Sequence, residues 1–425
     1  MNRHFFLAPS WRMNVTPMKR IILTLGTLGL LALASCSTTP GAHGVKNRIE
    51  SQKRVAGHAA RLELEQAYRA YTTGMFDQAM KYAEQARLRT PQDPSAYMLM
   101  ARICLEQGRL ESSDKLIGQA LTLDPSIPDA HYLRGVVYQR WSRDEQALDA
   151  YMTAWNVDPN SVQSVHYLLA AGEVLVDMKR YQMARELLIP KLGYFENNAA
   201  MHHLLGTIAV LEKNGELAIE HLGQAYLIGG EDEIILADLA RAQLDHKKYR
   251  ECLRNLDTLE TILAESVPGW LFELRARCYK AMGSPRDARS SYVQLLRIEP
   301  ENVDAWIEYG DMAHQIGDFG RLDTCGGRLI SIAPDRFEGY FYKGIVYLEA
   351  NKLEAAQVWF TKASHVAPHD EPIPSLAVAH VEMIRGDKMA ARDAFKDVLK
   401  RSPDDPTTRS YVETIATGSL DFIPE

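Results

Sequence analysis

FEGYFYKGIVYLEANKLEAAQVWFTKASHVAPHD, the stretch from Phe337 to Asp370, has the pattern of two short amphipathic helices. A polar break at Asn351-Lys352 separates its halves, and Pro368 follows the second half, where proline cannot continue a helix. Each half places apolar or small residues at the spacing of one helical face: Tyr340, Gly344 and Tyr347, then Leu353, Ala356, Phe360 and Ala363. The stretch therefore predicts a helical hairpin.

One such hairpin leaves an apolar face uncovered, and isolated helices of about 12–15 residues are marginal in water, so the hairpin needs neighbours like itself. The sequence supplies them at a fixed spacing. Prolines 34 residues apart recur in two series: Pro91, Pro125 and Pro159, then Pro300, Pro334 and Pro368. A repeating unit of 34 residues is typical of a stacked helical array.

The unit resembles the tetratricopeptide repeat (TPR), which carries a large residue, Leu-Gly, Tyr, Ala, an aromatic residue, Ala and Pro at fixed offsets. Residues 337–370 match nearly all of these offsets and depart at Lys343, where the family has Leu. Read in the same register, residues 60–403 form about ten repeats. The resemblance implies an all-α fold, a right-handed TPR superhelix (α-solenoid) of about ten helical hairpins.

Some repeats depart from the pattern. The fourth fits only with about three extra residues after Pro159, and Pro190 interrupts its second helix. The fifth and sixth lack the terminal proline, which leaves their register less well defined, and the tenth follows one extra residue. Residues 404–425 place Tyr411 and Ile415 at helical spacing, which predicts one capping helix and a tail.

The N-terminus has the pattern of a secretory signal peptide. A basic start at Lys19-Arg20 precedes an apolar run, Ile21 to Leu33, and small residues lead to Cys36. The run is shorter than the roughly 20 apolar residues that span a bilayer. We expect residues 1–35 to be removed, and translation to start at Met18 because Met18-Lys19-Arg20 already forms a complete basic start.

The sequence Leu-Ala-Ser-Cys at this point resembles the lipobox of bacterial lipoproteins. The resemblance implies that Cys36 carries diacylglycerol and becomes the first mature residue; an ordinary signal peptide with a chance cysteine is the alternative. Residues 36–59 would then be the lipidated cysteine and a flexible linker, since Ser37 to Val45 is rich in small residues. Ser rather than Asp follows the cysteine, so the resemblance favours the periplasmic face of the outer membrane, with the inner membrane as alternative.

Composition limits the kinds of partner and of chemistry. Without residues 1–35 the chain keeps 44 basic and 55 acidic residues, a net charge of −11, which argues against a nucleic-acid partner. The motifs HExxH, GxSxG, CxxC and the P-loop are absent, so we expect no enzymatic activity and no cofactor. Four cysteines lack metal-ligand spacing and are expected in the core: Cys104, Cys252, Cys278 and Cys325. No metal site is expected, and Cys252 with Cys278 is the one conceivable disulfide.

Binding is the function that remains. In TPR arrays the first helices of successive hairpins line a concave groove, and exposed aromatic and arginine side chains are the usual anchors of an interface. For each such residue, packing against a neighbouring helix is the alternative role. The register places seven candidates in the groove: Tyr132, His203, Arg241, Trp270, Arg277, Phe341 and Tyr342.

Together these patterns predict a lipid-anchored scaffold that holds a protein or peptide ligand in its groove within the bacterial cell envelope. The layout is similar to that of the pilot lipoproteins of type IV pili, in which a lipobox precedes fewer TPRs, so assembly of a pilus or secretion complex is the leading hypothesis. An adaptor for peptidoglycan enzymes is a second hypothesis. An enzyme with its site in the groove is a third.

Overall fold

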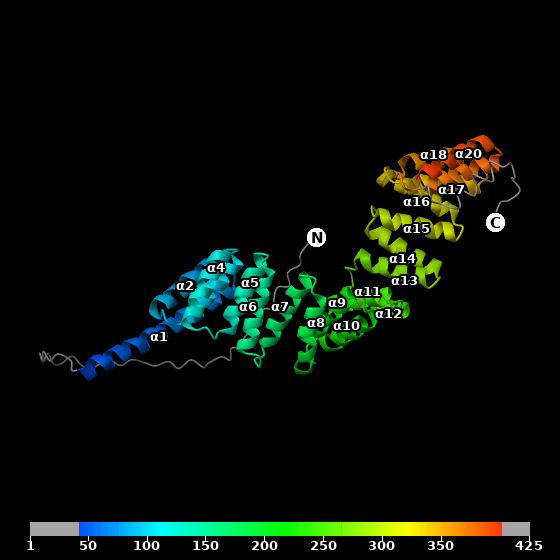
Figure 1. Cartoon of the computed structure of the whole chain (residues 1–425). Coiled ribbons are helices and arrows are strands. Elements are labelled where there is room, and N and C mark those ends of the chain that lie inside the picture. The colour runs from blue at the N-terminus through cyan, green and yellow to red at the C-terminus, as the bar shows by residue number, and fades with distance from the viewer. Residues whose placement is uncertain (1–41, 231, 265, 402–425) are drawn as a thin grey trace.

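The computed structural model describes residues 42–230, 232–264 and 266–401 of the chain, which form twenty α-helices, one 3-10 helix and no strand. The helices pair in chain order into ten hairpins that stack into an elongated, bent array (Figure 1). The expected all-α solenoid of about ten hairpins is confirmed. The signal peptide, Cys36 and the capping helix predicted over 404–425 lie outside the described residues.

The first five hairpins are α1 (Ala42–Thr72) with α2 (Phe76–Arg89), α3 (Pro94–Glu106) with α4 (Leu110–Leu123), α5 (Pro128–Arg140) with α6 (Asp144–Val157), α7 (Ser164–Asp177) with α8 (Tyr181–Leu188), and α9 (Ala199–Leu211) with α10 (Gly215–Gly229). The last five are α11 (Glu233–Asp245) with α12 (Tyr249–Leu263), α13 (Gly269–Ala281) with α14 (Pro285–Ile298), α15 (Val303–Gln315) with α16 (Phe319–Ile332), α17 (Phe337–Glu349) with α18 (Leu353–Val366), and α19 (Ile373–Arg385) with α20 (Lys388–Arg401).

The turn inside each hairpin fixes the register of the array. A left-handed residue there ends the first helix and lets the chain reverse, as the bond from the Asp318 N–H to the Ala313 carbonyl (2.8 Å) illustrates. The equivalent residue has a positive φ in all ten hairpins: Gly74, Gly108, Ser142, Lys179, Lys213, Lys247, Gly283, Gly317, Asn351 and Gly386. The fifth and sixth repeats, whose register was poorly defined by sequence, therefore keep the 34-residue step.

Three steps between successive turn residues exceed 34 residues. They are 37 residues from Ser142 to Lys179, 36 from Lys247 to Gly283 and 35 from Asn351 to Gly386. The first and third correspond to the insertions expected from the sequence. The second was missed because the sixth repeat lacks the proline that would have marked its end.

The fourth hairpin is irregular, as the sequence predicts. Its second helix, α8, has eight residues and passes into the 3-10 helix η1 (Ile189–Tyr194). Pro190 lies at the start of η1, where its missing N–H and fixed φ prevent a continuous α-helix.

Small residues at the motif positions let the helices approach closely. A Cβ on Gly344 would overlap the ring of Phe360, so this glycine makes room for the aromatic residue of its own hairpin. Gly310 makes room in the same way for Tyr342 of the following hairpin. A continuous buried cluster runs from Ala209 to Val381, and smaller clusters link the hairpins before it.

One sequence-based expectation was wrong: residues 42–59 are not a flexible linker. They form the first half of α1, which projects from the array as a single helix (Figure 1). The stretch from Val45 to Ala56 contains neither Gly nor Pro, and Glu50 and Arg54 lie 3.9 Å apart at the i,i+4 spacing that supports a helix. Among the described residues, no helix is both long and apolar enough to cross a bilayer.

Candidate partner-binding groove

The first helices of the fifth, sixth and seventh hairpins bring four of the seven predicted groove residues together. His203 comes from α9, Arg241 from α11, and Trp270 and Arg277 from α13. They occupy the middle of the array, where α9, α11 and α13 follow one another (Figure 1).

A chain of polar contacts crosses these three helices. His203 Nε2 lies 2.9 Å from Asp238 Oδ2, and Asp238 Oδ1 accepts a hydrogen bond of 3.0 Å from Arg241 Nη1. The Arg241 guanidinium lies 4.7 Å from the centre of the Trp270 ring, a cation–π distance. Each contact fixes the side chain that follows it, so Trp270 and Arg241 are held in place before any partner binds.

A hollow of about 310 Å³ opens beside this pair, and it is lined by Arg241, Leu244, Asp245, Trp270, Glu273, Leu274 and Arg277. Arg277 pairs with Glu273 at 2.6 Å on α13. The side chains of Arg241 and Arg277 remain about half exposed, 47% and 58%. The hollow thus offers two guanidinium groups, two carboxylates and a partly exposed indole, a combination that suits a polypeptide segment.

Two other predicted groove residues pack against aromatic neighbours. Tyr132 lies between Tyr151 and Tyr167, with ring centres 5.4 and 5.5 Å away, and burial raises the pKa of its hydroxyl. Phe341 packs against Phe360 with ring centres 5.4 Å apart. Both side chains are half-buried, so packing accounts for much of their surface.

Tyr342 is not in the groove, contrary to the prediction. Only 3% of its surface is exposed, and its hydroxyl donates within the array, 2.8 Å from the Ile307 carbonyl and 2.7 Å from Asp311 Oδ1. The ring enters the space left by Gly310 in the preceding hairpin, so Tyr342 joins two hairpins rather than facing a partner.

The sequence analysis selected aromatic and arginine residues and missed the carboxylates that position them. Asp238 is three residues before Arg241, and Glu273 is four before Arg277. Such spacing places opposite charges on one helical face and could have revealed both pairs.

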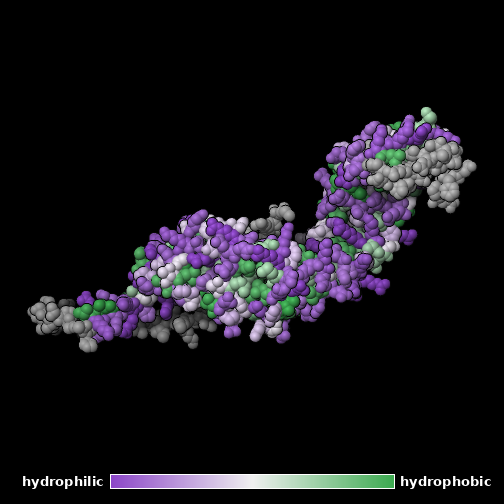
Figure 2. All heavy atoms as spheres, in the orientation of Figure 1, coloured by the Kyte–Doolittle hydropathy of each residue, from purple (hydrophilic) through white to green (hydrophobic). Residues whose placement is uncertain are grey.

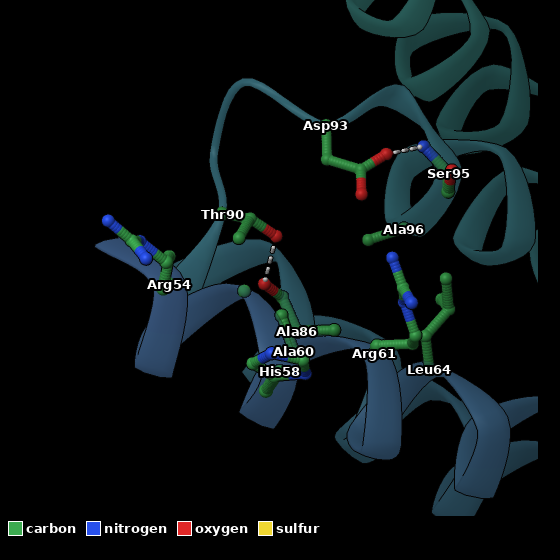
Figure 3. Close-up of a pocket in the computed structure, with 11 residues that line it drawn as sticks. Arg54, His58, Ala60, Arg61, Leu64, Ala86, Thr90, Asp93, Ser95 and Ala96 are labelled. Carbon is green, nitrogen blue, oxygen red and sulfur yellow. Dashed lines mark hydrogen bonds between the residues drawn. The ribbon is translucent and has the colours of Figure 1, made fainter. Parts of the chain in front are cut away.

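A second hollow, of about 450 Å³, lies at the N-terminal end of the array between α1, α2 and α3 (Figure 3). Arg61 and Leu64 occupy the repeat positions in α1 that Trp270 and Glu273 occupy in α13, so the groove begins here. Asp93 accepts from the Ser95 N–H at 2.9 Å and Thr90 donates to the Ala86 carbonyl at 3.1 Å. Arg54, His58 and Arg61 give this end a basic lining.

The cysteines outside the signal region are buried, as expected: Cys104, Cys252, Cys278 and Cys325 are free thiols in the core. Cys252 on α12 and Cys278 on α13, the pair considered for a disulfide, are both free. Across the part of the chain that the structure describes, no three His, Cys, Asp or Glu side chains gather as they would around a metal ion.

Models of the tetratricopeptide repeat match residues 70–137 and 274–321. The chain is 24% identical over 334 residues to the human protein O-mannosyl-transferase TMTC3, covering 76% of this chain and 34% of that protein. It is 22% identical over 213 residues to the type IV pilus assembly protein PilF of Pseudomonas aeruginosa, covering 49% of this chain and 82% of PilF. The chain thus spans about a third of the human relative's length.

The solved structure of PilF from Pseudomonas aeruginosa superimposes with a TM-score of 0.42 at 21% identity, covering 52% of this chain and 97% of PilF. That of PilW, a type IV pilus biogenesis factor, gives 0.44 at 14% identity, covering 49% of this chain and 94% of PilW. The two family matches fall on the first three hairpins and on the seventh and eighth, and the same left-handed turn residue recurs in every hairpin of the array. The chain therefore contains tetratricopeptide repeats within an array of ten similar hairpins.

Proposed function

We propose that this protein is a lipid-anchored scaffold of the bacterial cell envelope that binds a segment of a protein partner in the groove of α9, α11 and α13. The observation that carries the proposal is the Arg241–Trp270 pair, which lies 4.7 Å apart beside an open hollow and is held by Asp238. A preorganised arginine and a tryptophan in one place are typical of a binding hot spot.

The lining of the hollow indicates what kind of segment would bind. Arg241 and Arg277 can donate to main-chain carbonyls or to acidic side chains of the partner, while Asp245 and Glu273 can accept from its N–H groups. An apolar or aromatic partner residue would lie against Trp270. The expected ligand is therefore an extended segment of mixed charge with an apolar anchor.

The sequence also supports a proposal for the place of action. The lipobox-like residues before Cys36 support attachment to the membrane, and the serine after it supports the periplasmic face of the outer membrane. PilF and PilW are described as a pilus assembly protein and a pilus biogenesis factor, and both resemble this chain over about half its length. We therefore propose that the partner belongs to an envelope assembly such as a pilus or secretion complex.

Substitution in the groove tests the binding function. Trp270→Ala, with or without Arg241→Glu, should weaken capture of the native partner by about tenfold or more, because loss of a hot-spot side chain costs about 2 kcal/mol. Partners would be identified by crosslinking in intact cells and mass spectrometry of what co-purifies with the full chain. Trp359→Ala is the matched control, since Trp359 also packs with a cation, Lys362 at 4.4 Å, but on a second helix, α18.

Three outcomes separate the hypotheses. Equal capture by the Trp270 and Trp359 variants would contradict the groove as the binding site. Unchanged capture with loss of a cellular phenotype after a polar groove substitution would favour an enzyme. For the anchor, Cys36→Ala should move the protein out of the membrane fraction, and retention there would contradict lipidation at Cys36.

A further inference from the structure

The projecting half of α1 has no partner in the array. Every residue from Val45 to Val55 is exposed, including three aliphatic side chains: Val45, Ile49 and Val55 are 42%, 48% and 67% exposed. The cover that α2 provides ends near Arg89, which pairs with Glu63 at 2.7 Å. Ala56 and Gly57 are already partly buried, so the eleven residues from Val45 to Val55 extend about 16 Å beyond the packed part of α1.

An apolar stripe, interrupted by Gln52, runs along this half. Val45, Ile49 and Ala56 follow at steps of four and seven residues, and the same steps lead on to Ala60 and Ala67, which pack in the first hairpin. The stripe is thus the core face of α1 continued past the point where protein covers it. Figure 2 shows hydrophobic residues at the projecting end of α1 with hydrophilic residues around them.

Basic side chains border the stripe on both sides. Lys46 and Lys53 lie on one side of Val45 and Ile49, and Arg48 lies on the other. From residue 45 to residue 61 there are five Lys or Arg residues and a single acid, Glu50, whereas the chain as a whole has a net charge of −7. Glu50 lies further around the helix from the stripe than Lys46 does, and its carboxylate is paired with Arg54. The projecting helix is thus a basic segment in an acidic protein.

We propose that this face of α1 binds the surface of an anionic lipid bilayer. Val45 and Ile49 would enter the boundary between headgroups and acyl chains, while Lys46, Arg48 and Lys53 would contact lipid phosphates. Two aliphatic side chains bordered by long cations bury too little area for a stable protein interface, but they suit an interfacial helix, whose affinity combines apolar burial with attraction to anionic lipids. The proposal goes beyond the groove and does not require an acyl chain on Cys36.

A fluorophore on α1 tests the proposal in the full chain. Cys36→Ser combined with Ile49→Cys leaves one accessible thiol among the described residues, because the other four cysteines are buried. An environment-sensitive dye at position 49 should shift to shorter wavelength, and be quenched by brominated lipid, with vesicles containing phosphatidylglycerol at low salt. Neutral phosphatidylcholine vesicles or high salt should abolish both effects.

The matched control carries the same dye at Asn47→Cys, which is also exposed but lies on the opposite side of the helix. The apolar run from Ile21 to Leu33 is common to both proteins, so its insertion would affect both dyes alike. Lys46→Glu with Lys53→Glu should lower partition of the protein to anionic vesicles by at least about tenfold.

Equal responses at positions 47 and 49, or a response independent of lipid charge, would overturn the proposal. A spectral shift at position 49 that needs no vesicles and grows with protein concentration would assign the face to a second copy of the chain instead. In these variants Cys36 is replaced and Trp270 is unchanged. A negative result would therefore contradict lipid binding by α1 without bearing on the lipid anchor or on the groove.

Discussion

At the scale of single residues, two buried histidines join the helices of the fifth hairpin. His202 and His221 are each 8% exposed, their Nδ1 atoms lie 3.2 Å apart, and His202 Nε2 lies 3.1 Å from the Glu196 carbonyl. One ring must donate and the other accept. Burial, and then the neighbouring His202, lower the pKa of His221, while Glu220 acts weakly in the opposite direction.

This pair should make the protein less stable in mild acid. An unfolded histidine titrates near pH 6.5, whereas the folded His221 resists protonation to a lower pH, so below about pH 6.5 the unfolded chain binds a proton that the folded chain does not. The melting temperature should fall between about pH 7.5 and pH 5.5, and fall less in His221→Asn. Calorimetry of both proteins across this range provides the measurement, and parallel curves would show that the pair does not contribute.

The sequence predicted the positions of some candidate groove residues and not those of others, for a physical reason. Arg241 and Trp270, both on first helices, could be predicted from the motif register, and both line the hollow. Tyr342 could not, because its burial depends on the absence of a side chain at Gly310, one hairpin earlier. Whether a side chain on a first helix is exposed depends on residues of its own repeat and of the preceding one. The motif describes a single repeat, so it cannot predict this exposure.

At the scale of helices, the left-handed turn residue limits the stability of several hairpins. Lys247 has φ +62°, a conformation that costs a residue with a Cβ roughly 1–2 kcal/mol and glycine almost nothing. Lys247→Gly should therefore stabilise the sixth hairpin by about 0.5–1 kcal/mol after the extra flexibility of unfolded glycine is subtracted. Lys248→Gly is the control, because Lys248 has φ −86° and gains nothing from the change.

Urea unfolding followed by circular dichroism would compare these two variants with the parent protein. If Lys247→Gly proved no more stable than Lys248→Gly, the left-handed turn would not be a source of strain.

Local sequence patterns predicted the hairpins but not all of their limits. Prolines mark the ends of second helices, so the insertion near Pro159 was visible, while the one before Gly283 had no marker. The small residues after Cys36 predicted a linker, yet good helix formers from Val45 onward let α1 begin at Ala42. Helix propensity outweighed the absence of a partner for the helix to pack on.

At the scale of the whole molecule, contacts between neighbouring helices hold together the part of the array that the structure describes. Substantial helix contacts join the two helices of one hairpin or helices of consecutive hairpins. Stability in such an array is a sum over repeats and their interfaces, so damage should remain local. The groove at α9 to α13 and the projecting α1 can therefore be altered independently.

Gly344→Ala tests this locality. The new methyl would overlap the Phe360 ring, which should cost about 1–3 kcal/mol in the ninth hairpin. Hydrogen exchange monitored by mass spectrometry should then speed up in α15 to α20 and stay unchanged in α3 to α10. Gly223→Ala, with no atom within 4 Å of the new methyl, should instead stabilise α10 slightly. Faster exchange across the entire array would contradict a nearest-neighbour solenoid.

The uneven steps between turn residues have a consequence for the evolution of this chain. Extra residues occur at three connections between hairpins and inside none of the ten turns, whose left-handed residue and closing hydrogen bonds fix their length. A connection only has to join the second helix of one hairpin to the first helix of the next, so lengthening it costs little conformational entropy. Descendants of such a chain can acquire or lose material at these joints, and so alter its reach, while each inherited hairpin keeps its own shape.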